Sequence, residues 1–235
     1  DIVMTAKILQ LVNSAFFGLP QSITSPFQAV NLLGTNTIKA LILSVGIFSA
    51  FDKIRSPGFS LEDLWMHSMK VGSLSKQIIL SEMSNTAVAE EASIAGLLHD
   101  IGKLLMLQTD GYSRKTGNLL IESDITLSEA ENQIYGTTHA EVGAYLLALW
   151  GLPGNIVESV AYHHKPSVLN SGSFSILTAL HYSNAMFSHK EPPTQILDSP
   201  YLDKNYIHSL KLEKKLNEWA KIYQKIIKTD AVNEI

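Results

Sequence analysis

Seven polar residues interrupt the apolar faces of predicted helices: His67, His99, Asp100, His139, His163, His164 and Asn184. Imidazole and carboxylate groups are the ligands that suit Zn, Mn, Fe and Ni ions in proteins. A single buried histidine commonly bonds only a nearby backbone carbonyl. Five histidines, one aspartate and one asparagine on the inward faces of five helices instead favour convergence on one site, since helices that meet in a bundle assemble ligands in this way.

The helical repeat assigns these residues to inward faces. In the predicted helix 61–82, His67 fills the gap in a stripe spaced by three and four residues, formed by Leu64, Val71, Leu74 and Ile78. The other stripes belong to helices 138–150, 153–162 and 173–189, and they contain or lead to His139, His163, His164 and Asn184. His181 lies to one side of the last stripe, so we expect it to support the site from behind.

The predicted helix 86–108 differs, because it is apolar nearly all round between Ala92 and Leu107. This pattern is typical of a central helix that others surround. Its middle nevertheless contains His99 and Asp100. A buried carboxylate requires a charged partner or a metal, and Lys103 follows one helical turn later.

The elements that must position these residues are predicted to be helices throughout, and no segment alternates with a period of two. The expected helices cover roughly 2–15, 26–32, 35–52, 61–82, 86–108, 111–120, 127–135, 138–150, 153–162, 173–189 and 210–228. Ser60 with Asp63 and Ser128 with Glu131 have the spacing of helix-capping pairs. The breakers Pro57-Gly58 and Pro192-Pro193 divide the chain into an N-terminal helical part (1–57), a helical core (58–191) and C-terminal packing helices (192–235).

Composition excludes several classes of protein. The 235 residues include 46% apolar and 17% charged residues and carry a net charge of −4, as in an ordinary globular protein. Without cysteine, the chain cannot form disulfides or thiolate metal sites.

The basic run 211–228 alternates with apolar and acidic residues and indicates a solvated helix face, so we expect no nucleic-acid partner. No apolar run reaches the roughly 18 residues that span a bilayer, so we expect a cytoplasmic protein without a membrane partner. Because the chain opens on Asp1 in mid-helix character, we also expect residues before it.

The residues His99-Asp100-Ile101-Gly102-Lys103 resemble the signature of the HD superfamily of metal-dependent phosphohydrolases. Over residues 1–190 the chain is similar to one branch, the HDOD (HD-related output) domain of bacterial signalling proteins. The similarity rests on several segments in the same order and spacing: NSAFFGLP (13–20), AVNLLG (29–34), LWMHS (64–68), HAEVGA (139–144), WGLP (150–153) and HHKP (163–166). The resemblance implies an all-α, HD-domain-like bundle with an N-terminal helical subdomain.

The resemblance also implies roles for individual residues. His67, His99 and Asp100 match metal ligands of the superfamily, in which a metal-activated water attacks a phosphate ester. His139, His163 and His164 match further ligands of the related HD-GYP branch, so one or two divalent ions (Fe, Mn, Ni or Zn) are expected. Lys103 matches a lysine that contacts phosphate, and Asp63 matches an acidic position that some members use.

Two departures from the superfamily pattern argue against turnover. Asn184 stands where a late aspartate is expected, which removes one negative ligand. Lys165-Pro166-Ser167 follows the histidine pair, in place of the Gly-Tyr-Pro signature of cyclic-dinucleotide phosphodiesterases.

We therefore expect a regulatory module that acts through signalling proteins or fused sensory domains and holds a metal or a small phosphorylated ligand. The first alternative is a phosphohydrolase in which Asp100 and Lys103 are catalytic. The second is a helical scaffold with an empty polar core.

Overall fold

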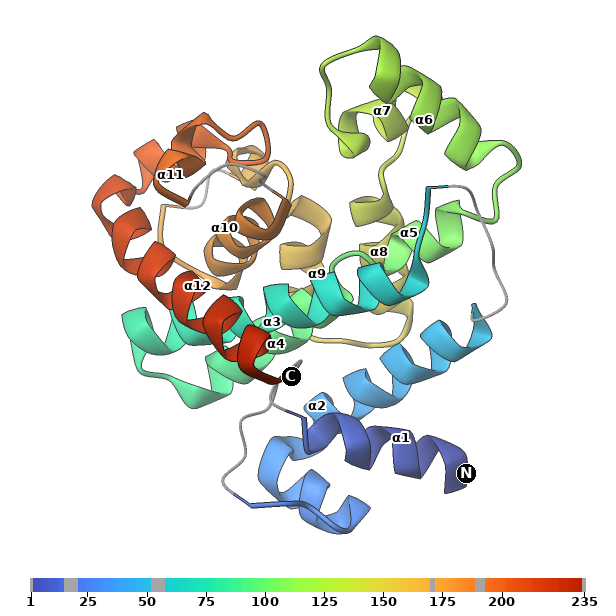
Figure 1. The fold of residues 1–235 in the computed structure, drawn as a ribbon, viewed down its shortest axis with the longest axis vertical. Coiled ribbons are helices and arrows are strands. Elements are labelled where there is room, and N and C mark those ends of the chain that lie inside the picture. The colour runs from blue at the N-terminus through green and yellow to red at the C-terminus, as the bar shows by residue number, and fades with distance from the viewer. Residues whose placement is uncertain (1, 15–20, 52–57, 170–171, 189–192, 234–235) are drawn as a thin grey trace.

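A computed structural model describes residues 2–14, 21–51, 58–169, 172–188 and 193–233. Over these ranges the chain is helical and forms no strand, which confirms the predicted all-α class. Figure 1 shows the arrangement of the helices, which are α1 (Ile2–Val12), α2 (Pro26–Ala50), α3 (Leu61–Met83), α4 (Thr86–Leu98), α5 (Ile101–Met106), α6 (Tyr112–Glu122), α7 (Leu127–Tyr135), α8 (His139–Leu149), α9 (Gly154–Tyr162), α10 (Ile176–Ser188), α11 (Lys204–Ser209) and α12 (Glu213–Asn233), with 3₁₀ helices η1 (Pro166–Leu169) and η2 (Pro193–Asp198). Some predicted features lie outside the described ranges: the helix ends at residues 15, 52 and 189, most of segment 13–20, and the boundary residues Pro57 and Pro192.

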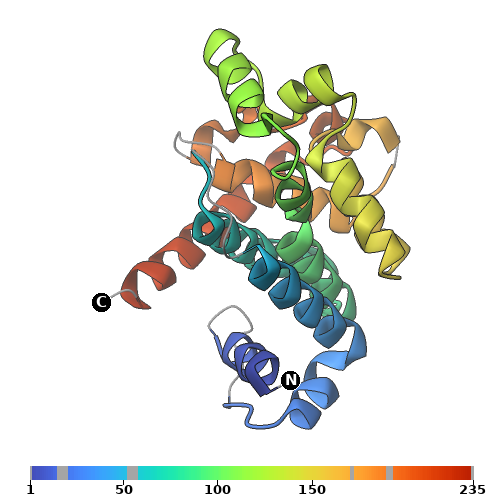
Figure 2. The ribbon, with the colours of Figure 1, turned by 90° about the vertical axis from the view of Figure 1, so that its right-hand side faces the viewer.

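The N-terminal helices α1 and α2 pack against each other at one end of the molecule (Figure 2). Gly34 bends α2, because its backbone adopts a positive φ of 80° that side chains other than glycine rarely tolerate. The bend separates the two helices predicted at 26–32 and 35–52. No single helix among the described residues has the length and hydropathy required to cross a membrane, and only the two halves of α2, Pro26–Thr35 and Thr37–Ala50, meet these criteria as a pair bent by 109°.

The core of the molecule is built on the contact between α3 and α4. Their backbones meet at Gly72 and Gly96, where a side chain on Gly96 would overlap with the backbone of Gly72. Helix α10 packs against both helices and α9 covers α4. Leu97 extends the apolar contacts of α4 to the cluster of buried side chains from α1 and α2.

The predicted single helix 86–108 is wrong. Helix α4 ends at Leu98 and α5 begins at Ile101, with Asp100 in a non-helical conformation (φ −99°, ψ 6°) between them. The backbone N–H of Lys103 donates to the Asp100 carbonyl, which starts the new helix. The break places His99 and Asp100 at a helix junction inside the core, where both side chains are at most 1% exposed.

The C-terminal part packs on the core through α12, which contacts α3. The fully buried Trp219 donates its indole N–H to Glu82 of α3. The predicted helix 210–228 corresponds to α12, whereas the short helix α11 was not predicted.

Candidate metal centre

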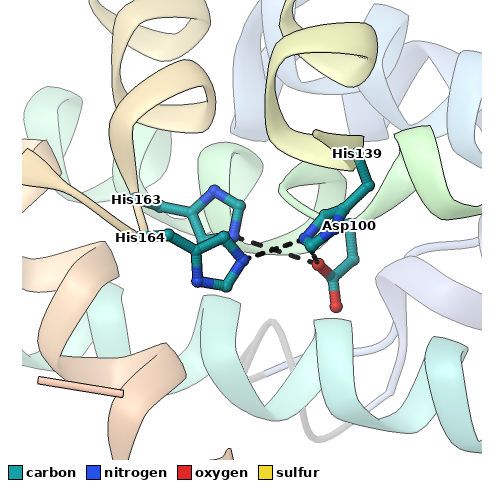
Figure 3. Close-up of side chains that lie close together, drawn as sticks. All are labelled: Asp100, His139, His163 and His164. Atoms are coloured by element: carbon teal, nitrogen blue, oxygen red, sulfur yellow. Dashed lines mark hydrogen bonds and ion pairs between the residues drawn. The ribbon is translucent and has the colours of Figure 1, made fainter. Parts of the chain in front are cut away.

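Two groups of side chains in the described residues converge closely enough to hold a metal ion. The first group contains Asp100, His139, His163 and His164, and the second contains His67, His99 and Asp100. Within each group, one potential ligand atom from every residue lies within 4.8 Å of the others. Figure 3 shows the first group, with the imidazoles of His163 and His164 facing His139 and Asp100. The structure thus brings together the histidines and the aspartate selected from the sequence.

Asp100 belongs to both groups, and its two oxygens face different partners. Oδ1 lies 3.2 Å from His139 Nε2 and 3.9 Å from His163 Nε2. Oδ2 lies 3.3 Å from His99 Nε2 and 3.7 Å from His67 Nε2. A carboxylate placed in this way can serve two cations at once, one on each oxygen.

The ring orientation of two histidines is fixed from behind by backbone carbonyls. His99 Nδ1 donates to the Gly96 carbonyl and His163 Nδ1 donates to the Val160 carbonyl, both at 2.7 Å. A neutral imidazole that donates from Nδ1 presents a lone pair on Nε2. This arrangement is the usual support of a metal-ligating histidine.

Three buried atoms at the centre lack a hydrogen-bond partner among the described residues: His99 Nε2, His163 Nε2 and Asp100 Oδ1. Buried polar atoms are normally satisfied. His163 Nε2 and Asp100 Oδ1 belong to the first group and His99 Nε2 to the second, and imidazole nitrogens and carboxylate oxygens of this kind are donors suited to a divalent transition metal. The residues therefore fit the metal that the sequence predicts.

The pKa shifts keep three of the imidazoles neutral and the carboxylate ionised, whereas for His139 burial works to lower the pKa but the contacts with Asp100 and Glu131 raise it. Burial lowers the pKa of His163 and His164 well below its ordinary value, and burial with the nearby His99 lowers the pKa of His67 to about 4. Burial works to raise the pKa of Asp100, but its interactions with His99 and Lys103 hold it well below the usual range. Neutral imidazoles and an ionised carboxylate are the forms that bind metals.

The second group has a polar and partly open edge. His67 Nε2 lies 3.0 Å from Asn184 Oδ1, so the asparagine borders this side of the cluster. Lys103 Nζ donates to Asp100 Oδ2 at 2.6 Å, which supplies the charge partner expected for the buried carboxylate. The side chains of His67 and Lys103 are 23% and 22% exposed. Asp63 is exposed and belongs to neither group.

Sequence reasoning missed Glu131, which is completely buried behind His139. Its Oε2 lies 2.6 Å from His139 Nδ1. The predicted capping pair of Ser128 and Glu131 is wrong, because α7 begins at Leu127, as the predicted helix 127–135 does, with a capping box between Thr126 and Glu129 two residues earlier. The predicted pair of Ser60 and Asp63 is confirmed, since the Ser60 hydroxyl accepts from the Asp63 N–H.

His181 supports the centre from the C-terminal side. Its Nδ1 donates to the carbonyl of His163 at 2.7 Å, and its Nε2 accepts the backbone N–H of Asp203 at 2.8 Å. This is the supporting position that the sequence predicts. The contact ties the segment before α11 to a residue of the first group.

Comparison with known proteins identifies relatives of this fold. Residues 1–166 match the sequence model of the HDOD domain. An uncharacterized protein of Treponema pallidum (strain Nichols) is 26% identical over 168 residues, which cover 70% of this chain and 32% of that protein. The chain therefore spans about one third of the length of this relative.

Three solved structures share the fold. An HDOD domain protein of unknown function from Geobacter sulfurreducens is 23% identical with a TM-score of 0.66, covering 95% of this chain and 82% of that one. A proposed phosphohydrolase from Shewanella amazonensis SB2B is 22% identical with a TM-score of 0.65, covering 94% and 82%. A proposed signal transduction protein from Marinobacter aquaeolei VT8 is 18% identical with a TM-score of 0.55, covering 97% and 52%.

Proposed function

Because the chain belongs to the HDOD domain family, we propose that it is an output module of bacterial signal transduction that binds divalent transition metal in its buried His/Asp cluster and acts through contacts with other proteins. The observation that carries the proposal is the shared carboxylate of Asp100, whose two oxygens face two separate sets of imidazoles. One ion would be held by Asp100, His139, His163 and His164. A second would be held by Asp100, His67 and His99, with the Asn184 amide beside them.

The burial of the cluster supports a regulatory or structural use of the metal. His99, Asp100, His139 and His163 are at most 1% exposed. Metal sites enclosed by protein ligands are typically structural, whereas catalytic sites keep a position open for substrate. Asn184 adds to this argument, since a neutral amide holds a cation less strongly than the carboxylate found at this place in phosphohydrolases.

The outer face of α8 supports action through protein contacts. Tyr145 and Leu149 lie one helical turn apart and are 69% and 66% exposed. Large apolar side chains exposed together are typical of interaction surfaces. The same helix begins with His139, so a partner on this face would contact an element that also carries a cluster residue.

A second candidate, a metal-dependent phosphohydrolase, is favoured by one observation. Lys103 and His67 are the partly exposed members beside Asp100 Oδ2, so a phosphate could reach the cluster at this edge. A bound divalent ion would act there as a Lewis acid toward a phosphate oxygen. Lys103 would then pair its ammonium group with the phosphate, and Asp100 would stay ionised beside it.

Metal analysis and activity assays test both candidates. We expect purified protein, supplemented with Mn, Fe, Ni or Zn, to retain close to a stoichiometric amount of metal without hydrolysing phosphomonoesters or phosphodiesters. Metal contents below about a tenth of an equivalent would refute the proposed function. Hydrolysis that disappears in a folded Asp100→Ala variant would replace the regulatory proposal with the second candidate.

A further inference from the structure

Glu131 is a buried carboxylate with both oxygens engaged. Oε2 accepts from the backbone N–H of His139 at 2.9 Å and from His139 Nδ1 at 2.6 Å. Oε1 accepts from the Tyr112 hydroxyl at 2.5 Å. A fully buried charge is costly unless it is compensated in this way, so these three bonds fix the position of the carboxylate.

The contact with Glu131 determines how His139 faces the cluster. Because the carboxylate can only accept, His139 Nδ1 must carry a hydrogen, and its Nε2 points toward Asp100 Oδ1 and His164 (Figure 3). A carboxylate behind a ligating imidazole fixes the ring orientation and makes the other nitrogen a stronger donor to metal. Glu131 thus lies directly behind a predicted metal ligand, on the side opposite to the cluster.

Glu131 also belongs to a separate part of the fold, the arm formed by α6 and α7. The two helices pack against each other and α7 contacts α8, and in both ribbon views the arm projects from one side of the molecule (Figures 1 and 2). Among the described residues, neither cluster of buried apolar side chains includes a member of α6 or α7. The polar chain from Tyr112 through Glu131 to His139 therefore links the arm directly to α8.

We propose that Glu131 is a positioning residue for the metal centre and couples the placement of the arm to metal binding at His139. This inference rests on the proposed function and adds a route by which the site is regulated. Coupling between two sites is reciprocal. Metal at the cluster stabilises the docked arm, and a partner that holds the docked arm raises the affinity for metal.

The chain offers a matched control for this proposal. Glu129 lies on the same helix and receives the same substitution, but its carboxylate caps α7 at Thr126 instead of contacting His139. Co²⁺ serves as the probe because its visible absorption reports the ligand geometry. We expect Glu131→Gln to lower Co²⁺ affinity by roughly 10–100-fold and to alter the absorption bands, whereas Glu129→Gln retains both.

Hydrogen exchange measures the coupling directly. In the wild-type protein and in Glu129→Gln, Co²⁺ should slow amide exchange in residues 112–135, and in Glu131→Gln it should not. If Glu131→Gln does not fold, Tyr112→Phe takes its place, since it removes only the hydroxyl that holds Oε1. That variant should lose roughly three- to ten-fold in Co²⁺ affinity, less than the loss of a residue in direct contact with a ligand.

The outcomes separate the two proposals. Absence of Co²⁺ binding by the wild-type protein would refute the proposed function. If the wild-type protein binds Co²⁺ and Glu131→Gln binds it with the same affinity and spectrum, the positioning role alone is refuted. Where Tyr112→Phe replaces Glu131→Gln, the same result with that variant refutes it. Equal exchange of the arm with and without bound Co²⁺ in the wild-type protein would refute the coupling.

Discussion

The Nε2 atoms of His139 and His164 lie 2.9 Å apart, with their ring planes at 86°. Two imidazole nitrogens at this distance require a proton or a cation between them, because a neutral nitrogen without hydrogen presents a lone pair. His139 already donates from Nδ1 to Glu131, and burial keeps the pKa of His164 well below its ordinary value. A proton on His139 Nε2 meets this requirement, since burial works to lower the pKa of His139 but its contacts with Asp100 and Glu131 raise it, and a divalent ion bound to both rings would displace that proton.

Substitutions in the two halves should have different effects on the amount of bound metal. Asp100→Ala should abolish binding at both halves, because both use its carboxylate. His67→Ala should remove only the second ion and leave about one equivalent. Asp63→Ala is the control, since this exposed carboxylate one turn away belongs to neither half. Native mass spectrometry counts the ions, and two ions retained by His67→Ala would contradict the assignment.

Asn184→Asp should strengthen metal binding. The Asn184 amide oxygen lies 3.0 Å from His67 Nε2, so an aspartate there adds a second carboxylate to the group of His67, His99 and Asp100. We expect roughly a ten-fold gain in affinity, which corresponds to about 1.4 kcal/mol. Competition with a chelator measures the gain, and Ser188→Ala, which removes only a long contact to the same oxygen, serves as control. Equal or weaker affinity would place Asn184 outside the ligand set.

Helical periodicity places His67 and His139 toward the interior. The apolar stripe of a helix indicates which side faces the core. A polar residue on the stripe is therefore expected in the interior, whatever its hydrogen-bond partners are. This is why His67 could be assigned next to Leu64 and Val71 without coordinates. The break at His99 and Asp100 does not follow from this pattern, because segment 86–108 contains no proline and Asp100, the N-cap of α5, forms no side-chain capping hydrogen bond.

Glu131 illustrates a second limit of sequence reasoning. Thr126 with Glu129 and Ser128 with Glu131 have the same capping spacing, and the two pairs overlap. Local sequence does not decide between them. Glu131 instead contacts His139, which lies eight residues further along the chain and comes close when α7 packs on α8. Helix α11 was missed for another reason, since six residues are too few to show a helical period.

Gly102→Ala should destabilise the protein and disturb the metal centre. A Cβ at Gly102 would overlap with the carbonyl oxygen of His139, so α5 and α8 would have to move apart. We expect a loss of about 1–3 kcal/mol in the free energy of unfolding together with weaker metal binding. Gly117→Ala is the control, because no atom of the described residues outside its own stretch of helix lies within 4 Å of a Cβ at this position in α6, and it should gain about 0.5–1 kcal/mol. Urea unfolding of both variants checks the prediction, and equal stability would contradict it.

Asp203→Ala should cost stability at neutral pH and little in acid. Burial works to raise the pKa of Asp203, but hydrogen bonds from Ser167 and from the Tyr206 N–H hold it below its ordinary value. In the unfolded state the pKa of an aspartate carboxyl is about 3.9. When folding lowers this pKa, the carboxyl stabilises the fold above about pH 3.9, and the stabilisation is lost as the pH falls through the folded-state pKa. The loss should be about 1 kcal/mol at pH 7, as for other helix caps, and should shrink as the pH falls below the unfolded-state pKa of about 3.9 and through the lower folded-state pKa. Urea unfolding across this range measures the difference against Asp198→Ala, an exposed acid of the same segment with only a surface ion pair. A cost that stays constant from neutral to acid pH would show that the carboxylate charge is not its source.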